Sequence, residues 1–166
     1  MSALKDGILK FALKKQRSGK KAFVPWDKVK SALLIIDAKS GDHKQKLDKF
    51  IYESDKKWDV VFINLKSKEP IYKNLIELNS KDKNLIGLPN NKAISKISNT
   101  SYDLLINAAF EDLEYASILT HKAKAVFNCG FQAVGQELDL VLRREKGRGV
   151  YDYLDEMVSY LQMIKN

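Results

Sequence analysis

The sequence predicts an α/β fold, a three-layer sandwich around a mostly parallel sheet of five to six strands that is Rossmann-like or flavodoxin-like. Three observations predict it. Short, nearly continuous apolar runs recur from Ser31 onward, which is typical of strands covered on both faces. Segments of helical periodicity separate these runs, and such alternation predicts parallel strands between layers of helices. The 166 residues suffice for one domain whose core needs neither disulfides nor metals.

The apolar runs and the helical segments give the expected elements in order. The strands are expected at 32–37, 58–64, 84–88, 102–107 and 123–128, with a weaker sixth at 138–142. The helices are expected at 42–56, 70–79, 92–98, 111–121 and 149–164. Pro70 favours the start of the second helix. In the last helix Leu154, Met157, Val158 and Leu161 repeat on one side, so we expect this face to pack on the sheet.

The positive charge is concentrated at the N-terminus. Residues 1–30 hold nine Lys and Arg against two Asp, a net of 9 − 2 = +7 out of the +8 of the whole chain. We therefore divide the chain into a basic helical arm and linker, 1–30, and a single α/β domain, 31–166. This asymmetry favours an anionic partner, namely RNA, an acidic protein or a membrane surface. The arm residues expected to meet that partner are Lys10, Lys14, Lys15, Arg17, Lys20 and Lys21.

Residues 2–16 have the pattern of a helix with Leu4, Ile8 and Phe11 on one side. This helix is too apolar to stand free in water. Two interpretations stay open: it packs on its own domain or on a second copy in a homodimer, or it docks on a membrane surface or on RNA.

The cysteine and histidine content limits the chemistry. The single Cys129 cannot form an internal disulfide, and His43 and His121 have no zinc-ligand spacing around them, so we expect no metal and a reducing, cytoplasmic location. Lysines interrupt the apolar start before it resembles a secretory signal. No window approaches the apolar length of about 18 residues that a membrane span needs, so no transmembrane segment is expected.

Polar residues follow the expected strands where a ligand would bind. In an open parallel sheet, ligands bind beyond the carboxyl ends of the strands. Those ends carry Asp37, Asn64, Asn107 and Gly130, which are the candidate ligand-binding residues. The alternative interpretation is structural, because Asp and Asn are common in turns and helix caps.

Motifs for catalysis or cofactor binding are weak. The segment "DAKSGDHK" after the first strand lacks both the Walker pattern and the dinucleotide pattern GxGxxG, so no cofactor is expected. The turn "KGRG" at 146–149 is either a phosphate site at a helix N-terminus or a solvated turn. Cys129 near His121 suggests a thiol nucleophile, but a buried structural cysteine is the commoner case. Glu111 and Asp112 are explained by capping, so no catalytic residue is predicted.

The chain resembles two known families. A basic N-terminal "LKK", a strand ending in "IIDA", the run "YDLLIN", the segment "YASILTHKAKAVFNCG" and the end "YLQMIKN" resemble a family of small Bacteroidota proteins with a domain of unknown function, which implies an α/β sandwich and no activity. Residues 103–130 are similar to the N-terminal Rossmann-like half of heptosyltransferase-type glycosyltransferases. Those enzymes place the sugar-nucleotide site in a second Rossmann-like domain, so the resemblance implies the fold, and we expect no free-standing glycosyl transfer from these 166 residues.

Two functional hypotheses follow. The leading one is a non-enzymatic binding or adaptor domain whose basic arm engages an anionic partner. The alternative is a small-molecule or nucleotide-binding enzyme with its site at the C-terminal edge of the sheet.

Overall fold

A computed structural model of the chain describes residues 6, 7, 10, 13, 22–40, 44–131 and 138–164. Of the arm residues singled out above, Lys14, Lys15, Arg17, Lys20 and Lys21 lie outside the described residues, as do Leu4, Ile8, Phe11 and His43. The strands are β1 (Ser31–Asp37), β2 (Lys57–Ile63), β3 (Ile76–Leu78), β4 (Ser101–Asn107), β5 (Lys124–Phe131) and β6 (Leu140–Leu142). The α-helices are α2 (Lys44–Ser54), α3 (Asn91–Ser98), α4 (Leu113–Lys122) and α5 (Val150–Met163), and the 3-10 helices are η1 (Trp26–Lys28), η2 (Ala38–Ser40) and η3 (Ser80–Asp82).

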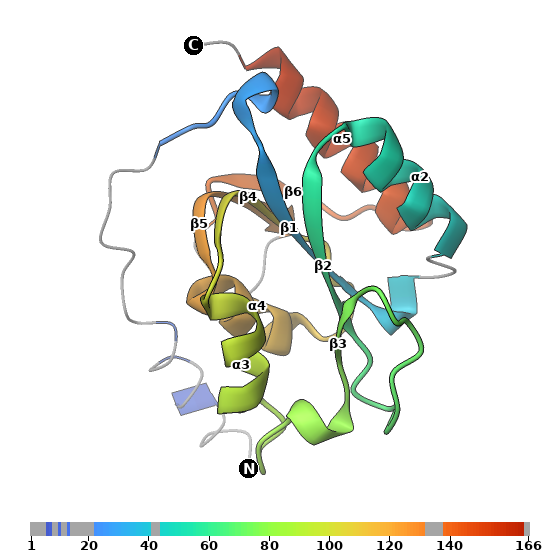
Figure 1. The fold of residues 1–166 in the computed structure, drawn as a ribbon, viewed down its shortest axis with the longest axis vertical. Coiled ribbons are helices and arrows are strands. Elements are labelled where there is room, and N and C mark those ends of the chain that lie inside the picture. Colours follow the sequence, from blue (N-terminus) through green and yellow to red (C-terminus); the bar gives the residue numbers. More distant parts are fainter. Residues whose placement is uncertain are drawn as a thin grey trace.

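The described strands form one six-stranded sheet in the order β3-β2-β1-β4-β5-β6, and every neighbouring pair is parallel (Figure 1). The predicted fold class is therefore confirmed. From β1 the chain adds β2 and β3 on one side, and it then returns to add β4, β5 and β6 on the other side. The direction of winding therefore reverses between β1 and β4. This is the doubly wound Rossmann-like order rather than the flavodoxin-like one, and its topological switch point lies between the carboxyl ends of β1 and β4.

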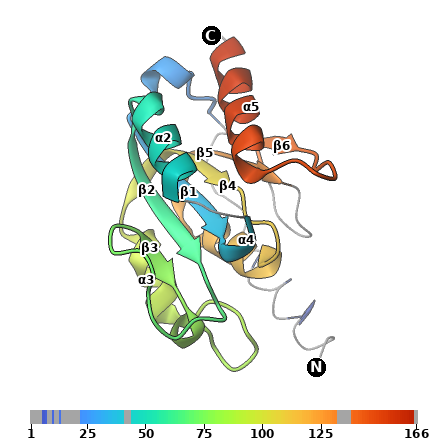
Figure 2. The same ribbon diagram turned by 90° about the vertical axis from the view of Figure 1, so that its right-hand side faces the viewer.

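Helices cover both faces of the sheet because successive strand residues point to opposite sides. Leu34 and Ile36 of β1 face the core that α2 and α5 close. Leu33 and Ile35 face the other core, which α3 and α4 close. Figure 1 shows α2 and α5 on one side of the strands and α3 and α4 on the other, and Figure 2 shows the same fold with α2 in front of the strands. The continuous apolar runs of the sequence reflect this burial on both sides.

The amphipathic pattern of the last helix is confirmed in α5. Leu154 is 0 % exposed, and Met157 and Leu161 are each 1 % exposed in the core against the sheet. Val158 is half-buried beside the same core. The 3.6-residue repeat alone was enough to identify this face.

The expected strand at 84–88 is wrong. The segment is a closed turn, in which the Asn84 carboxamide oxygen accepts the N–H groups of Ile86 (3.1 Å) and Leu88 (3.0 Å). Gly87 has φ +81°, a left-handed conformation that favours glycine. Apolar content suggested a strand here, but the Asn and Gly supply the turn chemistry that bends the run back on itself.

The expected helix at 70–79 is also wrong, because its last residues form the edge strand β3. The Glu77 carboxylate, which is 6 % exposed, accepts the N–H groups of Ile71 (2.6 Å) and Tyr72 (2.9 Å). The loop after Pro70 thus folds over Glu77 instead of winding into a helix. Pairing of β3 with β2 is a long-range interaction, and the local signal of Pro70 does not contain it.

Part of the N-terminal segment packs on the domain. Phe23, Val24 and Trp26 contact the core under α2 and α5. Farther toward the N-terminus, Leu13 is half-buried in a small cluster with Leu88 and Ile118. The boundary near residue 30 remains a prediction about domain organisation. Among the described helices, none is long and apolar enough to cross a membrane.

Candidate functional site at the carboxyl edge of the sheet

The four predicted ligand-binding residues lie along one edge of the sheet, because the strands that carry them are parallel. Asp37 ends β1, Asn64 follows β2, and Asn107 ends β4 opposite Gly130 of β5. All four are buried, and Asp37 is 0 % exposed. The sequence placed them correctly at this edge, whereas their burial follows from the loops that cover it.

Asp37 anchors the loop that crosses the switch point. Its Oδ2 atom accepts the backbone N–H groups of Phe110 (2.7 Å), Glu111 (2.7 Å) and Asp112 (3.3 Å), just before α4 begins. Three N–H groups converging ahead of a helix form the kind of arrangement that binds phosphate in nucleotide-binding folds. Here an internal carboxylate occupies that arrangement.

The contacts of the other three residues also serve the fold. They are Asn107, Gly130 and Asn64. The Asn107 side-chain oxygen accepts the N–H of Ala109 (3.2 Å), which turns the chain at the end of β4. A Cβ atom on Gly130 would lie 2.4 Å from the Asn107 carbonyl oxygen, so only glycine fits there. Asn64 donates its backbone N–H to the Leu78 carbonyl (2.8 Å) and thereby extends the pairing of β2 with β3.

The loop after β6 closes the same edge from the other side. The Arg144 guanidinium lies 4.3 Å from the centre of the Phe110 ring and donates to the Phe110 carbonyl (2.6 Å). Phe110 also packs edge-on against Phe131, with ring centres 5.3 Å apart. Arg148, in the "KGRG" turn, pairs with Glu156 (2.6 Å). These two arginines are engaged by the protein itself, which favours the structural interpretation of this turn.

A cavity of about 310 Å³ opens at this edge, and sequence reasoning missed it. The loop after β2, the turn at Gly87 and the start of α4 form its walls. Two of the residues around it, Glu111 and Asp112, are acids in the sequence ahead of a helix. Acids in that position are also typical of helix capping, so they did not by themselves indicate a cavity. The lining residues are Leu65, Gly87, Glu111, Asp112, Leu113, Glu114 and Tyr115.

The electrostatics of this cavity are acidic. The pKa of Asp112 is raised above its usual range, first because burial disfavours the carboxylate and then because Asp37 and Glu111 repel it. Glu111 forms an ion pair with Lys39. Burial raises the pKa of Tyr115, whose hydroxyl donates to the Asp82 carbonyl (3.0 Å). A cation or a neutral molecule therefore fits this cavity better than an anion.

Replacing Asp112 by Asn is expected to stabilise the protein at pH 7 by a few tenths of a kcal/mol, because a half-exposed charge is screened. A carboxyl whose folded pKa is raised loses stability as the pH rises through that value. The gain should therefore be present at pH 7 and vanish below the unfolded pKa of about 3.9. Urea unfolding of both proteins at pH 7 and pH 3 measures it. Asp48→Asn, on the exposed side of α2, is the control, and equal gains in the two variants would contradict the explanation.

Thiol and metal chemistry have little support at this edge. Cys129 is 0 % exposed, and burial raises the pKa of its thiol, so the group stays protonated and unreactive. Among the described residues no group of three or more His, Cys, Asp or Glu side chains has the arrangement of a metal site.

The strand order defines the class of protein: a doubly wound, Rossmann-like α/β domain, in which the loop after β4 is held on Asp37 at the switch point. The chain belongs to a family of unknown function, DUF6913, whose model matches residues 5–164. No curated protein and no solved structure matches the chain. The matched range begins at residue 5 and therefore includes most of the N-terminal segment.

Proposed function

We propose that this protein is a non-enzymatic binding or adaptor domain that engages an anionic partner through its basic N-terminal arm. One observation carries the proposal. The N–H groups ahead of α4, at the switch point of the sheet, are taken by the Asp37 carboxylate and are therefore not available to an anionic ligand. A nucleotide would have to displace a buried internal anion, and the acidic cavity beside it adds further repulsion.

The arm itself supports the anionic partner. Leu13 contacts the cluster of Leu88 and Ile118, so the arm has an anchor on the domain. Lys10, one turn earlier, is exposed. With a net charge of 9 − 2 = +7 over residues 1–30, an anchored arm presents a local field that the near-neutral domain does not cancel. We expect the partner to be RNA, an acidic protein or a membrane surface, and the location to be cytoplasmic.

Full-length protein is expected to bind single-stranded RNA with a strong salt dependence, because each phosphate contact releases counterions. Neutralising two arm lysines, as Lys14→Gln with Lys15→Gln, should reduce the slope of log K against log salt by about 1.4. Fluorescence anisotropy of a labelled oligonucleotide between low and physiological salt measures the slope. Vesicles with and without phosphatidylserine, run in parallel, distinguish a membrane partner from RNA.

The matched control removes two exposed lysines from the domain, as Lys46→Gln with Lys92→Gln. Both double variants lower the net charge equally, but only the arm variant should lose affinity. Equal losses would mean that binding follows total charge rather than the arm. Salt-independent behaviour of the full chain toward every polyanion would refute the proposal.

A second candidate function is small-molecule binding, with or without catalysis, at the carboxyl edge of the sheet. The cavity of about 310 Å³ favours it, because ligand pockets of such folds lie at this edge. Its acids favour a cationic or neutral ligand over the nucleotide that sequence reasoning suggested. A thermal-shift screen over amines, sugars and nucleotides tests it. The similarity of residues 103–130 to heptosyltransferase-type enzymes remains an expectation about fold.

A further inference from the structure

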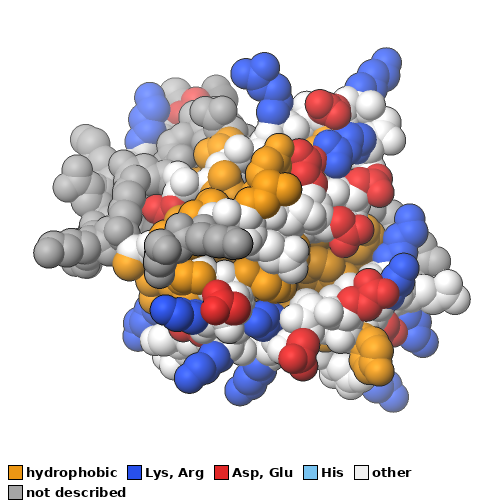
Figure 3. All heavy atoms as spheres, turned by 90° about the horizontal axis from the view of Figure 1, so that it is seen from above, with side chains coloured by type: hydrophobic (Ala, Val, Ile, Leu, Met, Phe, Trp, Pro, Cys, Tyr) orange, Lys and Arg blue, Asp and Glu red, His pale blue; other side chains and the backbone are white. Residues whose placement is uncertain are grey.

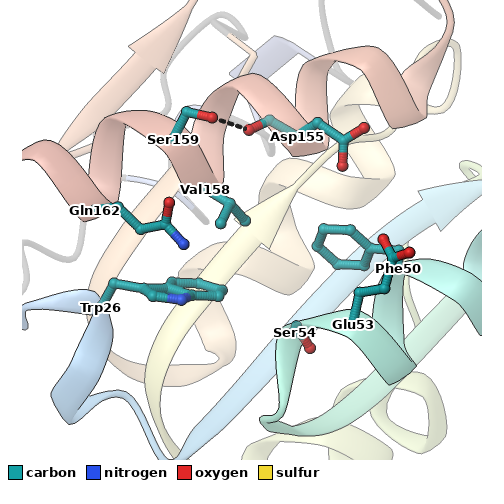
Figure 4. A pocket seen from close by; sticks show the side chains of 8 residues that line it. All are labelled: Trp26, Phe50, Glu53, Ser54, Asp155, Val158, Ser159 and Gln162. Atoms are coloured by element: carbon teal, nitrogen blue, oxygen red, sulfur yellow. Dashed lines mark hydrogen bonds between the residues drawn. The ribbon is translucent and has the colours of Figure 1, made fainter.

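A second cavity, of about 250 Å³, lies between η1, α2 and α5. It is at the opposite end of the sheet from the edge described above, since Trp26 precedes β1 and Ser54 precedes β2. Figure 4 shows side chains from the three elements around one space. The lining residues are Trp26, Phe50, Glu53, Ser54, Asp155, Val158, Ser159 and Gln162.

Aromatic and apolar side chains form one part of the wall of this cavity, and polar and charged ones form the rest. Trp26 lies along one side, the Phe50 ring along another, and Val158 reaches between them from α5 (Figure 4). The Phe50 ring is held in place by Trp58, with ring centres 5.2 Å apart. Trp58 is fixed in turn by a hydrogen bond from its indole to the Ser54 hydroxyl (2.6 Å). Contacts within the protein therefore hold the Phe50 side of the cavity in place without a ligand.

Two carboxylates from different helices lie at one end of the cavity. Glu53 of α2 and Asp155 of α5 both extend to the Phe50 side (Figure 4). The pKa of Asp155 is raised, first by burial and then by the charges of Glu53 and Asp152, while Lys49 opposes the shift. Lys49 Nζ is 3.8 Å from Glu53 Oε1 and largely exposed, so it compensates the pair weakly.

The aromatic wall is already suited to a positive charge. Lys56 Nζ lies 5.3 Å from the centre of the Trp26 ring, within the range of a cation–π interaction. Lys56 is not among the residues that line the cavity. An indole and a phenyl ring beside two carboxylates form the combination that recognises an organic ammonium group.

We propose that this cavity between η1, α2 and α5 binds a small organic cation, an ammonium group on an apolar body, with Trp26 and Phe50 against the body and Glu53 and Asp155 at the charge. The volume lies just below the usual range of about 300–1,000 Å³ for drug-sized ligands, so the ligand is small or is a single side chain. Both a free amine and a lysine side chain have this chemistry. The site goes beyond the proposed function, because it lies on the domain and attracts the opposite charge.

The surface around the cavity is compatible with access from solvent. Figure 3 looks onto this end of the molecule, where hydrophobic side chains reach the surface beside acidic ones.

The test titrates full-length protein with benzylammonium and follows the indole N–H signal of Trp26 by NMR, assigned with Trp26→Phe. Benzyl alcohol is the uncharged isostere, and Nα-acetyl-lysine methylamide represents a lysine side chain. We expect saturable shifts at Trp26 with benzylammonium and about tenfold weaker binding of the alcohol, in keeping with cation–π energies. Binding of the lysine derivative in preference to the free amine would assign the source as a peptide.

Glu53→Gln with Asp155→Asn is expected to weaken benzylammonium binding about tenfold, because both charges at the end of the cavity are lost. Both side chains are exposed, so the fold should persist, which the melting temperature checks. Asp48→Asn with Glu69→Gln removes the same charge elsewhere on the surface and should leave binding unchanged. Equal affinity for the alcohol, no shift at Trp26 with any probe, or equal effects of the two double variants would each overturn the proposal.

Discussion

Replacing Asp37 by Ala is expected to lower the free energy of unfolding by about 3 kcal/mol. The carboxylate is 0 % exposed and accepts two hydrogen bonds of 2.7 Å, from Phe110 and Glu111. Hydrogen bonds to a charged group are worth about 1.5–3 kcal/mol each, and their loss leaves N–H groups without an acceptor in a partly buried loop. Urea unfolding at pH 7 gives the difference.

The local role of Asp37 is separable from its effect on overall stability. Amide hydrogen exchange at Phe110 and Glu111 should accelerate in Asp37→Ala by more than the loss of global stability explains. Asp37→Asn keeps the shape of the side chain and one acceptor oxygen, so its free energy of unfolding should fall less than that of Asp37→Ala. Asp48→Ala on the surface of α2 is the control for removing a negative charge. An unchanged unfolding free energy with unchanged exchange at these two amides would show that the carboxylate does not anchor the loop.

Replacing Leu154 by Asp is expected to cost at least about 4 kcal/mol and to leave the chain largely unfolded at physiological temperature. Leu154 is 0 % exposed on the face of α5 that packs on the sheet. A carboxylate there either stays charged without a partner or takes up a proton, and both states are costly in an apolar core. Circular dichroism melting curves measure the change.

Two further variants separate the effect of the buried charge from the effects of the lost side chain and of an added surface charge. Leu154→Ala should cost about 2–5 kcal/mol through the cavity alone, so the difference between the two variants isolates the buried charge. Tyr160→Asp introduces the same side chain at a position that is 43 % exposed on the same helix, and it should have a small effect. A melting temperature of Leu154→Asp equal to that of Tyr160→Asp would mean that α5 does not pack on the sheet through this face.

The two wrong elements have a common physical cause. Residues 84–88 are apolar enough for a strand, but the hydrogen bonds of Asn84 close them into a turn. Residues 76–78 have the charged Glu77 at their centre, and glutamate is uncommon in strands. One oxygen of its carboxylate, Oε2, accepts the N–H groups of Ile71 and Tyr72 from the loop folded over it. The other oxygen, Oε1, is buried without a hydrogen-bond partner among the described residues, so the loop compensates the buried charge only in part.

The sequence predicted where the candidate site residues lie but not what their side chains contact. Asp37 and Asn107 end parallel strands, so their place at one edge follows from the apolar runs before them. Whether such residues face a ligand or the protein depends on the loop after β4, which lies over Asp37. The cavity between α2 and α5 was not predictable at all, because it is formed by the packing of three separate segments.

The sequence by itself determined the α/β class, the faces of the helices that are buried, and the concentration of charge in the N-terminal arm. These features depend on periodicity and composition, which are local properties of the chain. Only the tertiary structure decided the order of the strands, the place of the edge strand β3, and the use of Asp37 as an internal anion. Each of these depends on contacts between residues far apart along the chain, whose energies no local pattern records.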